Sequence, residues 1–521
     1  MFNDIRPYIT KDEPFGPIDS GDIDSGDLKA LLMLFEKHNW IYKNLHSRPS
    51  IIIGRRGSGK THYLRSVFFD SQYDYYVEIR TPSVLGQVAR AIQKMSAEVV
   101  FSESVSELWD MILWLAVLLE IRKHPIVQPD DVNIINGYLD NFNVRASDSV
   151  EDLLRHVADM FEEIVKKNET NESGLLWGAD RIRLDDAKAA VMRSLKTANK
   201  RFAILMDSLD DFQLDIESVE RSMQGLLKIV GSMNKPRDLV DIRFCLPSEL
   251  YQQFIKLSSN PNKDFRRTLK LQWTASELIL IGAQRLMFYM ALNHQEYYKK
   301  FIHLDLTKRN DALILFNSVL PERIKNLSGH QEETISYILR HTQLLPRHFV
   351  ILLNSIFKTV DPNSKHFPIN SDRIIQGIRQ MEEAMVGEIF VAFKLIYPTA
   401  DETCRRCLPE LGHKFTMGDL HRVFTRHGKA VFGNDNLFDF QRMLLEIGAI
   451  GRVMPGGKEK DLYIKGNFEY TVSHQLSLSQ DDELCIHPLF SGIYQNGNRQ
   501  ERPVYPYGSI LEDDDYRDGV E

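Results

Sequence analysis

The sequence predicts an α/β fold in which a parallel sheet carries helices on both faces and is followed by a largely helical region. Short apolar runs at residues 51–53, 202–206 and 241–246 end at a glycine, an acidic cluster and a proline, as buried parallel strands commonly do. Helical stretches separate these runs, which favours crossover connections over hairpins. The expected strands are residues 50–54, 75–80, 202–207, 241–246 and 269–273.

The first expected strand leads into the pattern G-x-x-x-x-G-K-T, which runs from Gly54 to Thr61 and should be followed by a helix. A strand, a glycine-rich loop and a helix N-terminus in that order form a cradle for phosphate groups, because backbone N–H groups gather where the helix dipole is positive. A chance glycine-rich turn is the alternative. The residues expected to bind the nucleotide are Gly54, Arg55, Arg56, Gly57, Ser58, Gly59, Lys60 and Thr61.

Two side chains of this loop have a predicted chemical role. The Lys60 ammonium is expected to reach the β- and γ-phosphates of ATP, and the Thr61 hydroxyl is expected to bind Mg²⁺. A Mg²⁺ site of this kind also needs a carboxylate at the end of a second buried strand, and Asp207 stands at that position.

An acidic cluster continues beyond Asp207. Asp210 or Asp211 is expected to orient or deprotonate the attacking water. A strand that simply ends in a solvated acidic turn is the alternative. Many ATPases of the AAA+ class carry Glu directly after the Mg²⁺-binding Asp, whereas this sequence has Ser208, so slow turnover is expected.

Composition narrows the class of protein. The chain has 521 residues, of which 43% are hydrophobic and 26% charged, and a net charge of −8. These values fit a globular chain of about three domains rather than a polybasic nucleic-acid coat. No apolar run reaches the roughly 18 residues of a membrane span, and no export signal is visible at the N-terminus. Four cysteines favour a reducing compartment, so a cytoplasmic location and no membrane association are expected.

The chain divides into five expected segments. More than a hundred residues separate the second and third strands, far more than a simple crossover needs, and their helical patterns indicate an insertion. The segments are an irregular N-terminal arm at residues 1–26, a nucleotide-binding core at 27–275 with a helical insertion at about 84–200, a helical lid at 276–385, a winged helix at 386–475, and a C-terminal extension with an acidic tail at 476–521.

The winged-helix prediction rests on the order of short elements. Helices are expected at 415–427 and 437–447, and two strands at 450–454 and 461–465 flank a turn rich in glycine. The fold class predicted for the whole chain is therefore an α/β P-loop NTPase core with a large helical insertion, followed by an α-helical lid and a winged-helix domain.

This order resembles the AAA+ ATPases of the origin-recognition branch, and resembles still more the STAND-like ATPases found in bacterial phage-defence operons. The segments 271–285, 345–348 and 444–451 also look like that group. The resemblance implies a lid arginine at the γ-phosphate, which Arg347 matches, and an arginine finger before the fifth strand, which Arg266 or Arg267 matches. Ser248, or its neighbour Glu249, would sense the γ-phosphate. Surface arginines and an ordinary helix start are the alternatives.

The resemblance leaves three functions open. In the first, ATP drives self-assembly into a homo-oligomer that gates a separate effector protein, in bacterial antiviral defence. In the second, the chain is a DNA-binding ATPase of the replication-initiator or transposition-regulator type, and its winged helix contacts nucleic acid through basic side chains nearly balanced by acids. In the third, which Ser208 keeps open, it is a nucleotide-binding scaffold. The basic side chains concerned are Arg422, Arg426, Lys429, Arg442, Arg452, Lys458 and Lys460.

Overall fold

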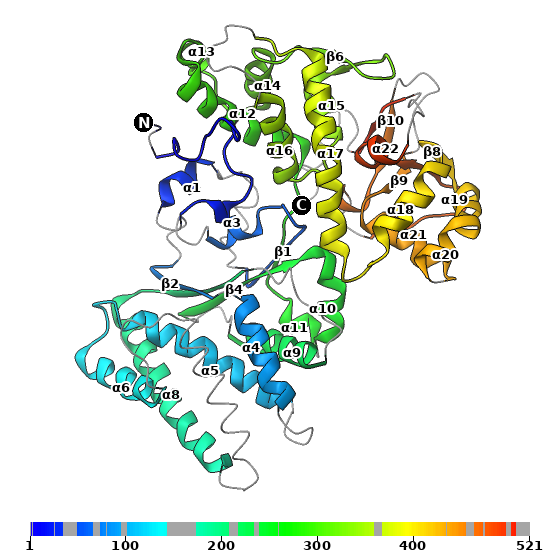
Figure 1. Cartoon of the computed structure of the whole chain (residues 1–521). Coiled ribbons are helices and arrows are strands. Elements are labelled where there is room, and N and C mark those ends of the chain that lie inside the picture. The colour runs from blue at the N-terminus through cyan, green and yellow to red at the C-terminus, as the bar shows by residue number, and fades with distance from the viewer. Residues whose placement is uncertain are drawn as a thin grey trace. The chain divides into compact units, whose positions relative to one another are not determined.

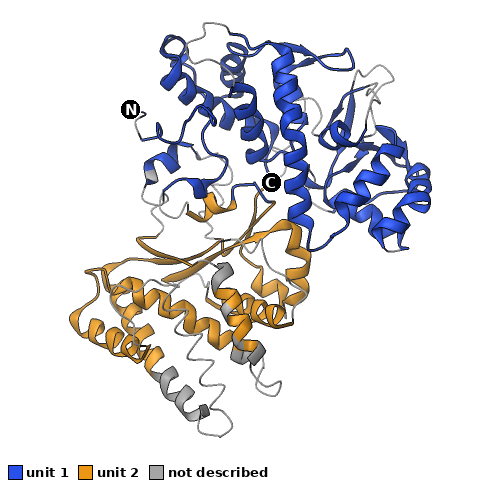
Figure 2. Cartoon of the chain, in the orientation of Figure 1, with its two compact units in different colours: residues 1–39, 56–59, 272–521 blue, residues 40–55, 60–271 orange. Residues whose placement is uncertain are grey.

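The structure is a computed structural model that divides into two compact units (Figure 2). Unit 1 comprises Met1–Asn39, Arg56–Gly59 and Gln272–Glu521, and unit 2 comprises Trp40–Arg55 and Lys60–Leu271. The residues that the structure describes are 2, 4–24, 27–34, 49–65, 73–79, 81–94, 102–142, 173–207, 217–233, 239–258, 260–358, 367–433, 435–454, 463–471, 475–495 and 502–506.

Unit 2 contains a five-stranded parallel sheet in the order β2-β3-β4-β1-β5. The strands are β1 (Ile51–Gly54), β2 (Tyr75–Ile79), β3 (Phe202–Met206), β4 (Val240–Pro247) and β5 (Thr268–Lys270). Each strand lies where the sequence predicts one, although β5 ends three residues early. A parallel sheet of this kind, flanked by helices, fits a P-loop-like core.

The register of the sheet places the functional segments at one edge. Ile53 pairs with Leu246, and Met206 pairs with Phe244. Because β1, β3 and β4 are parallel, the segments that follow them all leave the sheet at the same edge. β4 separates β1 from β3, so the turn after β4 begins between the glycine loop and Asp207.

Helices of unit 2 pack against this sheet, and Figure 1 shows α4, α5 and α9 together on one face. The apolar run at residues 111–119 is buried within α5, and the indole Nε1 of Trp109 donates to the Ser222 carbonyl of α9 at 2.9 Å. The helices are α3 (Lys60–Arg65), α4 (Thr81–Lys94), α5 (Ser102–Ile121), α6 (Pro129–Leu139), α8 (Ser173–Ala198), α9 (Glu217–Met233), α10 (Tyr251–Leu257) and α11 (Pro261–Asp264), with short 3-10 turns η3 (Asp140–Phe142) and η4 (Ser248–Leu250).

The helical insertion expected at about 84–200 is only partly described. α4, α5, α6 and α8 lie in or at the edge of this segment and are helical as expected, while residues 143–172 lie outside the described residues.

The first part of unit 1 is helical. Its elements are η1 (Ser20–Asp22), α1 (Leu28–Leu34), α12 (Ala275–Asn293), α13 (Gln295–Phe301), α14 (Arg309–Asn317), β6 (Arg323–Lys325), β7 (Gln331–Glu333), α15 (Thr334–Arg340), α16 (Pro346–Phe357) and α17 (Ser371–Phe393). α12 opens with a reciprocal capping box between Thr274 and Glu277. Among the described helices, α12 alone is long and apolar enough to cross a membrane, and 72% of that stretch is buried inside the fold, as in a core helix.

The N-terminal arm is packed rather than loose. Ile5 and Phe15 are fully buried. The buried Arg285 of α12 donates to the carbonyls of Leu34, Phe15 and Pro17 at 3.1, 2.9 and 2.8 Å. The arm and α1 therefore group with helices α12 to α17, and the boundary expected at residue 27 between arm and core does not separate the two units.

The last part of unit 1 holds a second sheet, in the order β12-β10-β9-β11-β8. Its elements are α18 (Ala400–Cys407), η5 (Leu408–Glu410), β8 (Lys414–Thr416), α19 (Met417–Val423), the π-helical turn η6 (Phe424–Gly428), α20 (Lys429–Phe432), α21 (Leu437–Glu446), β9 (Ile450–Val453), β10 (Ile464–Asn467), η7 (Glu469–Thr471), β11 (Glu483–Ile486), α22 (Pro488–Tyr494) and β12 (Val504–Tyr505).

Two of these strands lie beyond the boundary expected at residue 475. β11 inserts between β9 and β8, and its residues Leu484, Cys485 and Ile486 are fully buried. β12 pairs with β10, and the Tyr505 hydroxyl donates to the buried Glu332 of β7 at 2.5 Å. Residues 483–486 and 504–505, which were expected in the C-terminal extension, therefore belong to the folded sheet.

Candidate functional site

The glycine loop after β1 has the backbone that its sequence requires. Gly57 and Gly59 have φ angles of 83° and 87°, in the left-handed region that favours glycine. Gly54, by contrast, closes β1 and has no positive φ. A loop of two left-handed glycines between a buried strand and a helix can direct successive N–H groups toward one anion.

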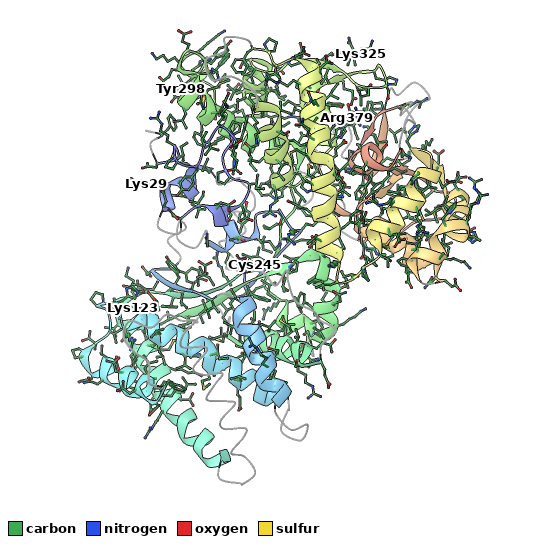
Figure 3. All side chains as sticks on the ribbon, viewed as in Figure 1. Lys29, Lys123, Cys245, Tyr298, Lys325 and Arg379 are labelled. Atoms are coloured by element: carbon green, nitrogen blue, oxygen red, sulfur yellow. The ribbon has the colours of Figure 1, made fainter. Side chains whose placement is uncertain are left out.

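Lys60 begins α3 and is buried, with 5% of its surface exposed. Its Nζ donates to the carbonyl oxygen of Arg55 at 3.3 Å, so the ammonium folds back over the loop that precedes it. Beneath it, the thiol of Cys245 on β4 lies 3.6 Å from the Lys60 carbonyl oxygen, and Figure 3 labels this cysteine at the sheet. A charged donor held over a phosphate-sized loop is suited to bind the phosphates of a nucleotide.

The residues expected to hold Mg²⁺ lie in contact. The Thr61 hydroxyl is 3.0 and 3.2 Å from the two carboxylate oxygens of Asp207, although 146 residues separate them in the chain. A hydroxyl and a carboxylate are hard oxygen ligands of the kind Mg²⁺ prefers, so the donor set fits this ion. Ser208, Asp210 and Asp211 lie outside the described residues.

Ser248 begins the turn η4 directly after β4, at the same edge of the sheet. Its hydroxyl is 3.3 Å from the Glu249 carboxylate. Since β4 lies between β1 and β3, this pair emerges between the glycine loop and Asp207. Polar groups at this position can accept or donate a hydrogen bond to a phosphate or to its attacking water.

Arg347 lies against the tip of the glycine loop, within unit 1. Its backbone N–H donates to the Gly57 carbonyl at 3.4 Å. A Cβ built on Gly57 would stand 3.0 Å from the Arg347 Cβ, so a larger residue at position 57 would crowd this arginine as well as strain the backbone. The Arg347 guanidinium pairs with the Asp19 carboxylate of the N-terminal arm.

Arg266 and Arg267 precede β5, at the amino end of the strands. Ile51 pairs with Thr268, whereas the glycine loop begins after Gly54, about 10 Å further along the parallel strands. Arg266 is exposed, and the Arg267 carbonyl accepts from Ser50 and Ile51. The two arginines therefore do not join the glycine loop of their own chain.

Sequence reasoning missed one contact of the loop and one contact of the adjacent Arg347. The Trp273 indole Nε1 donates to the Ser58 carbonyl at 2.9 Å, and Asp19 pairs with Arg347. Their separations of 215 and 328 residues left no local signal for either contact.

Most of the basic side chains considered for nucleic acid carry acidic neighbours. Arg442 of α21 pairs with Glu446 and Glu469, both at 2.6 Å, and only 14% of its side chain is exposed. Arg422 and Asp419 are 2.5 Å apart. The remaining described candidates are Lys429, 3.7 Å from Asp435, Arg452, 4.0 Å from Asp482, and Arg426, while Lys458 and Lys460 lie outside the described residues.

No protein-family model matches the chain, and no curated protein matches it. Among solved structures it is similar to the Aeropyrum pernix ORC2 protein, described as ADPNP-ADP complexes, with 14% sequence identity and a TM-score of 0.35 over 84% of this chain and 90% of that chain. A similarity of that level carries no conclusion about this chain, whose function is inferred from its own residues.

Proposed function

We propose that this chain binds ATP with Mg²⁺ and hydrolyses it slowly, as a molecular switch of the AAA+/STAND-like class. The observation that carries the proposal is the contact of 3.0 Å between the Thr61 hydroxyl and the Asp207 carboxylate beside a loop of two left-handed glycines. A phosphate cradle and a pair of Mg²⁺ ligands at one sheet edge are the two parts that a P-loop nucleotide site requires.

Each residue of the site has a separate task in this proposal. The loop N–H groups and Lys60 hold the phosphates, and the ammonium neutralises charge that develops on the γ-phosphate. Thr61 and Asp207 hold Mg²⁺, which supplies charge neutralisation and orients the phosphate oxygens. Asp210 or Asp211 orients the attacking water, and Ser248 senses the γ-phosphate.

Calorimetry with the full chain tests nucleotide binding. Lys60→Ala should weaken ATP binding at least about tenfold, because it removes a charge-assisted contact to phosphate. In the parent chain, Mg²⁺ should strengthen ATP binding. In Asp207→Asn, most of this strengthening should be lost, while weak Mg²⁺-independent binding of ATP remains. Lys123→Ala is the matched control, since Lys123, labelled in Figure 3, belongs to the same unit, is 47% exposed and pairs with its neighbour Glu120 at 2.8 Å. Equal ATP affinity in Lys60→Ala and the parent chain would contradict the site assignment.

The wider role is also a proposal. ATP would close the lid through Arg347 and promote a homo-oligomer in which Arg266 or Arg267 reaches a neighbouring chain's nucleotide, which fits their position away from their own loop. The oligomer would gate a separate effector in bacterial antiviral defence, in the cytoplasm. Copurification of the chain with the products of its genomic neighbours, with and without ATP, tests this role, and an ATP-independent set of partners would argue against it.

We also propose that residues 386–475, expected to form a winged helix, contact protein rather than DNA, and the ion pairs of their basic side chains support this proposal. Exposed α21 residues include Phe438, 68% exposed, whereas the Arg442 guanidinium on that helix is held by two glutamates. Phosphate contacts dominate the affinity of duplex readers, so paired arginines contribute little. Duplex DNA binding that falls steeply with salt, and that Arg422→Ala/Arg426→Ala weakens, would favour the DNA-binding alternative.

A further inference from the structure

The N-terminal arm brings a carboxylate to the arginine that lies against the glycine loop. The Asp19 side chain pairs with Nη2 of Arg347, and both residues belong to unit 1. Of the two side chains, Arg347 is 17% exposed and Asp19 is 42% exposed. The pair is therefore partly buried and is less screened by solvent than an ordinary surface ion pair.

Arg347 stands where its positive charge needs an anion. It is the second residue of α16, directly after Pro346, and the first turn of that helix contains no acidic residue. The N-terminus of a twelve-residue helix is itself partly positive, so a cation there is unfavourable unless an anion compensates it. The Arg347 N–H is meanwhile bonded to the Gly57 carbonyl, which fixes the base of the side chain beside the loop.

Asp19 is held ready to supply that anion. One carboxylate oxygen accepts from the Gly21 N–H at 2.9 Å and caps η1, while the other accepts from Arg347. The arm around it is fixed by Arg285 and by Asn354, whose side chain bonds the Phe15 N–H at 2.7 Å and the Gly16 carbonyl at 3.0 Å. The carboxylate is thus pre-organised by its own turn and by two anchors that do not involve Arg347.

We infer that Asp19 is a competitor of the γ-phosphate for Arg347, so that ATP, but not ADP, displaces the arm's carboxylate from this arginine. This inference rests on the proposed function. A guanidinium cannot be deprotonated and has five N–H donors, and the Arg347 Nε is buried without a hydrogen-bond partner among the described residues. A γ-phosphate on the glycine loop carries more charge than one carboxylate and can bind the Arg347 guanidinium with two oxygens. It therefore binds this guanidinium more strongly than the Asp19 carboxylate does. The exchange breaks the pair between Asp19 and Arg347, so this contact of the arm depends on which nucleotide is bound.

The test is calorimetry of ATP and ADP on the full chain. Asp19→Asn should tighten ATP binding about three- to tenfold, because a partly buried pair no longer competes, and should leave ADP affinity within about twofold. Asparagine keeps the side-chain oxygen that caps η1, so the turn should remain folded. In an Arg347→Ala background, Asp19→Asn should change neither affinity, since the competed group is gone.

Asp12→Asn is the matched control. Asp12 lies on the same arm and pairs with Lys358 at 2.9 Å, away from the loop, so its loss should leave ATP affinity unchanged. Unchanged or weakened ATP binding in Asp19→Asn, in a chain where Lys60→Ala weakens binding as expected, would overturn this inference and leave the proposed function standing. Absence of ATP binding in the parent chain would overturn both.

Discussion

Arg285→Met should release the N-terminal arm while leaving the rest of unit 1 folded. Arg285 is 3% exposed and donates to three carbonyls, those of Leu34, Phe15 and Pro17. Hydrogen bonds from a charged donor each contribute about 1.5–3 kcal/mol net to stability. Burial of the guanidinium offsets part of the stabilisation from the three bonds, and the same desolvation lowers the pKa of Arg285 to about 10. A net loss of about 3 kcal/mol for arm docking is expected, because methionine keeps the apolar volume and leaves the carbonyls without a donor.

Hydrogen exchange measures this loss directly. The Phe15 amide is a buried reporter inside the arm, bonded to the Asn354 side chain at 2.7 Å. About 3 kcal/mol raises the equilibrium constant for local opening by roughly 150-fold, so exchange at this amide should accelerate by that order while core strands keep their protection. In Arg285→Lys, the exchange rate of the Phe15 amide should lie between those of the parent chain and of Arg285→Met, because an ammonium retains the charge but reaches fewer carbonyls. The control is Arg379→Met, at an exposed arginine of α17 labelled in Figure 3. Unaltered exchange at Phe15 in Arg285→Met would refute the reasoning.

Three further predictions concern turnover, assembly and pH. Asp210→Asn or Asp211→Asn should slow phosphate release at least about tenfold without weakening ATP binding, and parental rates in both variants would remove them from the mechanism. Mixing Lys60→Ala chains with Arg266→Ala/Arg267→Ala chains should restore some hydrolysis if the finger acts in trans, whereas a specific rate independent of protein concentration would exclude that action. Burial, and then the nearby Arg340, lower the pKa of His341 below its ordinary value of 6.5, despite the Glu382 carboxylate at 3.0 Å. The unfolded chain therefore takes up this proton first as the pH falls, and the stability of the folded chain should decrease between about pH 7 and pH 5. Melting curves of His341→Asn should show a smaller decrease over this range, and an equal decrease would contradict the prediction.

The sequence predicted those parts of the site that are determined by a few consecutive residues. Gly57, Gly59 and Lys60 follow a buried strand directly, so backbone geometry and residue type determine the loop locally. Asp207 could be predicted because a fully buried apolar run must end at the sheet edge where parallel strands meet the loop. β1 and β3 followed from the same reasoning, since both are buried along their whole length and a strand buried on both faces is apolar.

The parts that the sequence did not predict depend on contacts across long separations. The arm reads as irregular because its prolines and aspartates disfavour regular structure, yet Arg285 and Asn354 bind its carbonyls and amides individually. β11 and β12 are short, and their strand character comes from pairing with β9 and β10 rather than from any period of their own. Arg442 was considered for nucleic acid because a sequence shows its charge but not the two glutamates that neutralise it.

The tip of the glycine loop is contacted by side chains that are distant in the sequence. Residues 56–59 group with unit 1, and three of their contacts come from that unit: the Trp273 indole on the Ser58 carbonyl, the Arg347 N–H on the Gly57 carbonyl, and the Arg347 side chain against Gly57 itself. The Ser58 and Gly57 carbonyls are therefore held by Trp273 and Arg347. The same Arg347 also pairs with Asp19, so one arginine contacts both Gly57 and the N-terminal arm. Gly57 is thus required for two independent reasons, its positive φ and the approach of Arg347, and only the first of them can be recognised in the sequence.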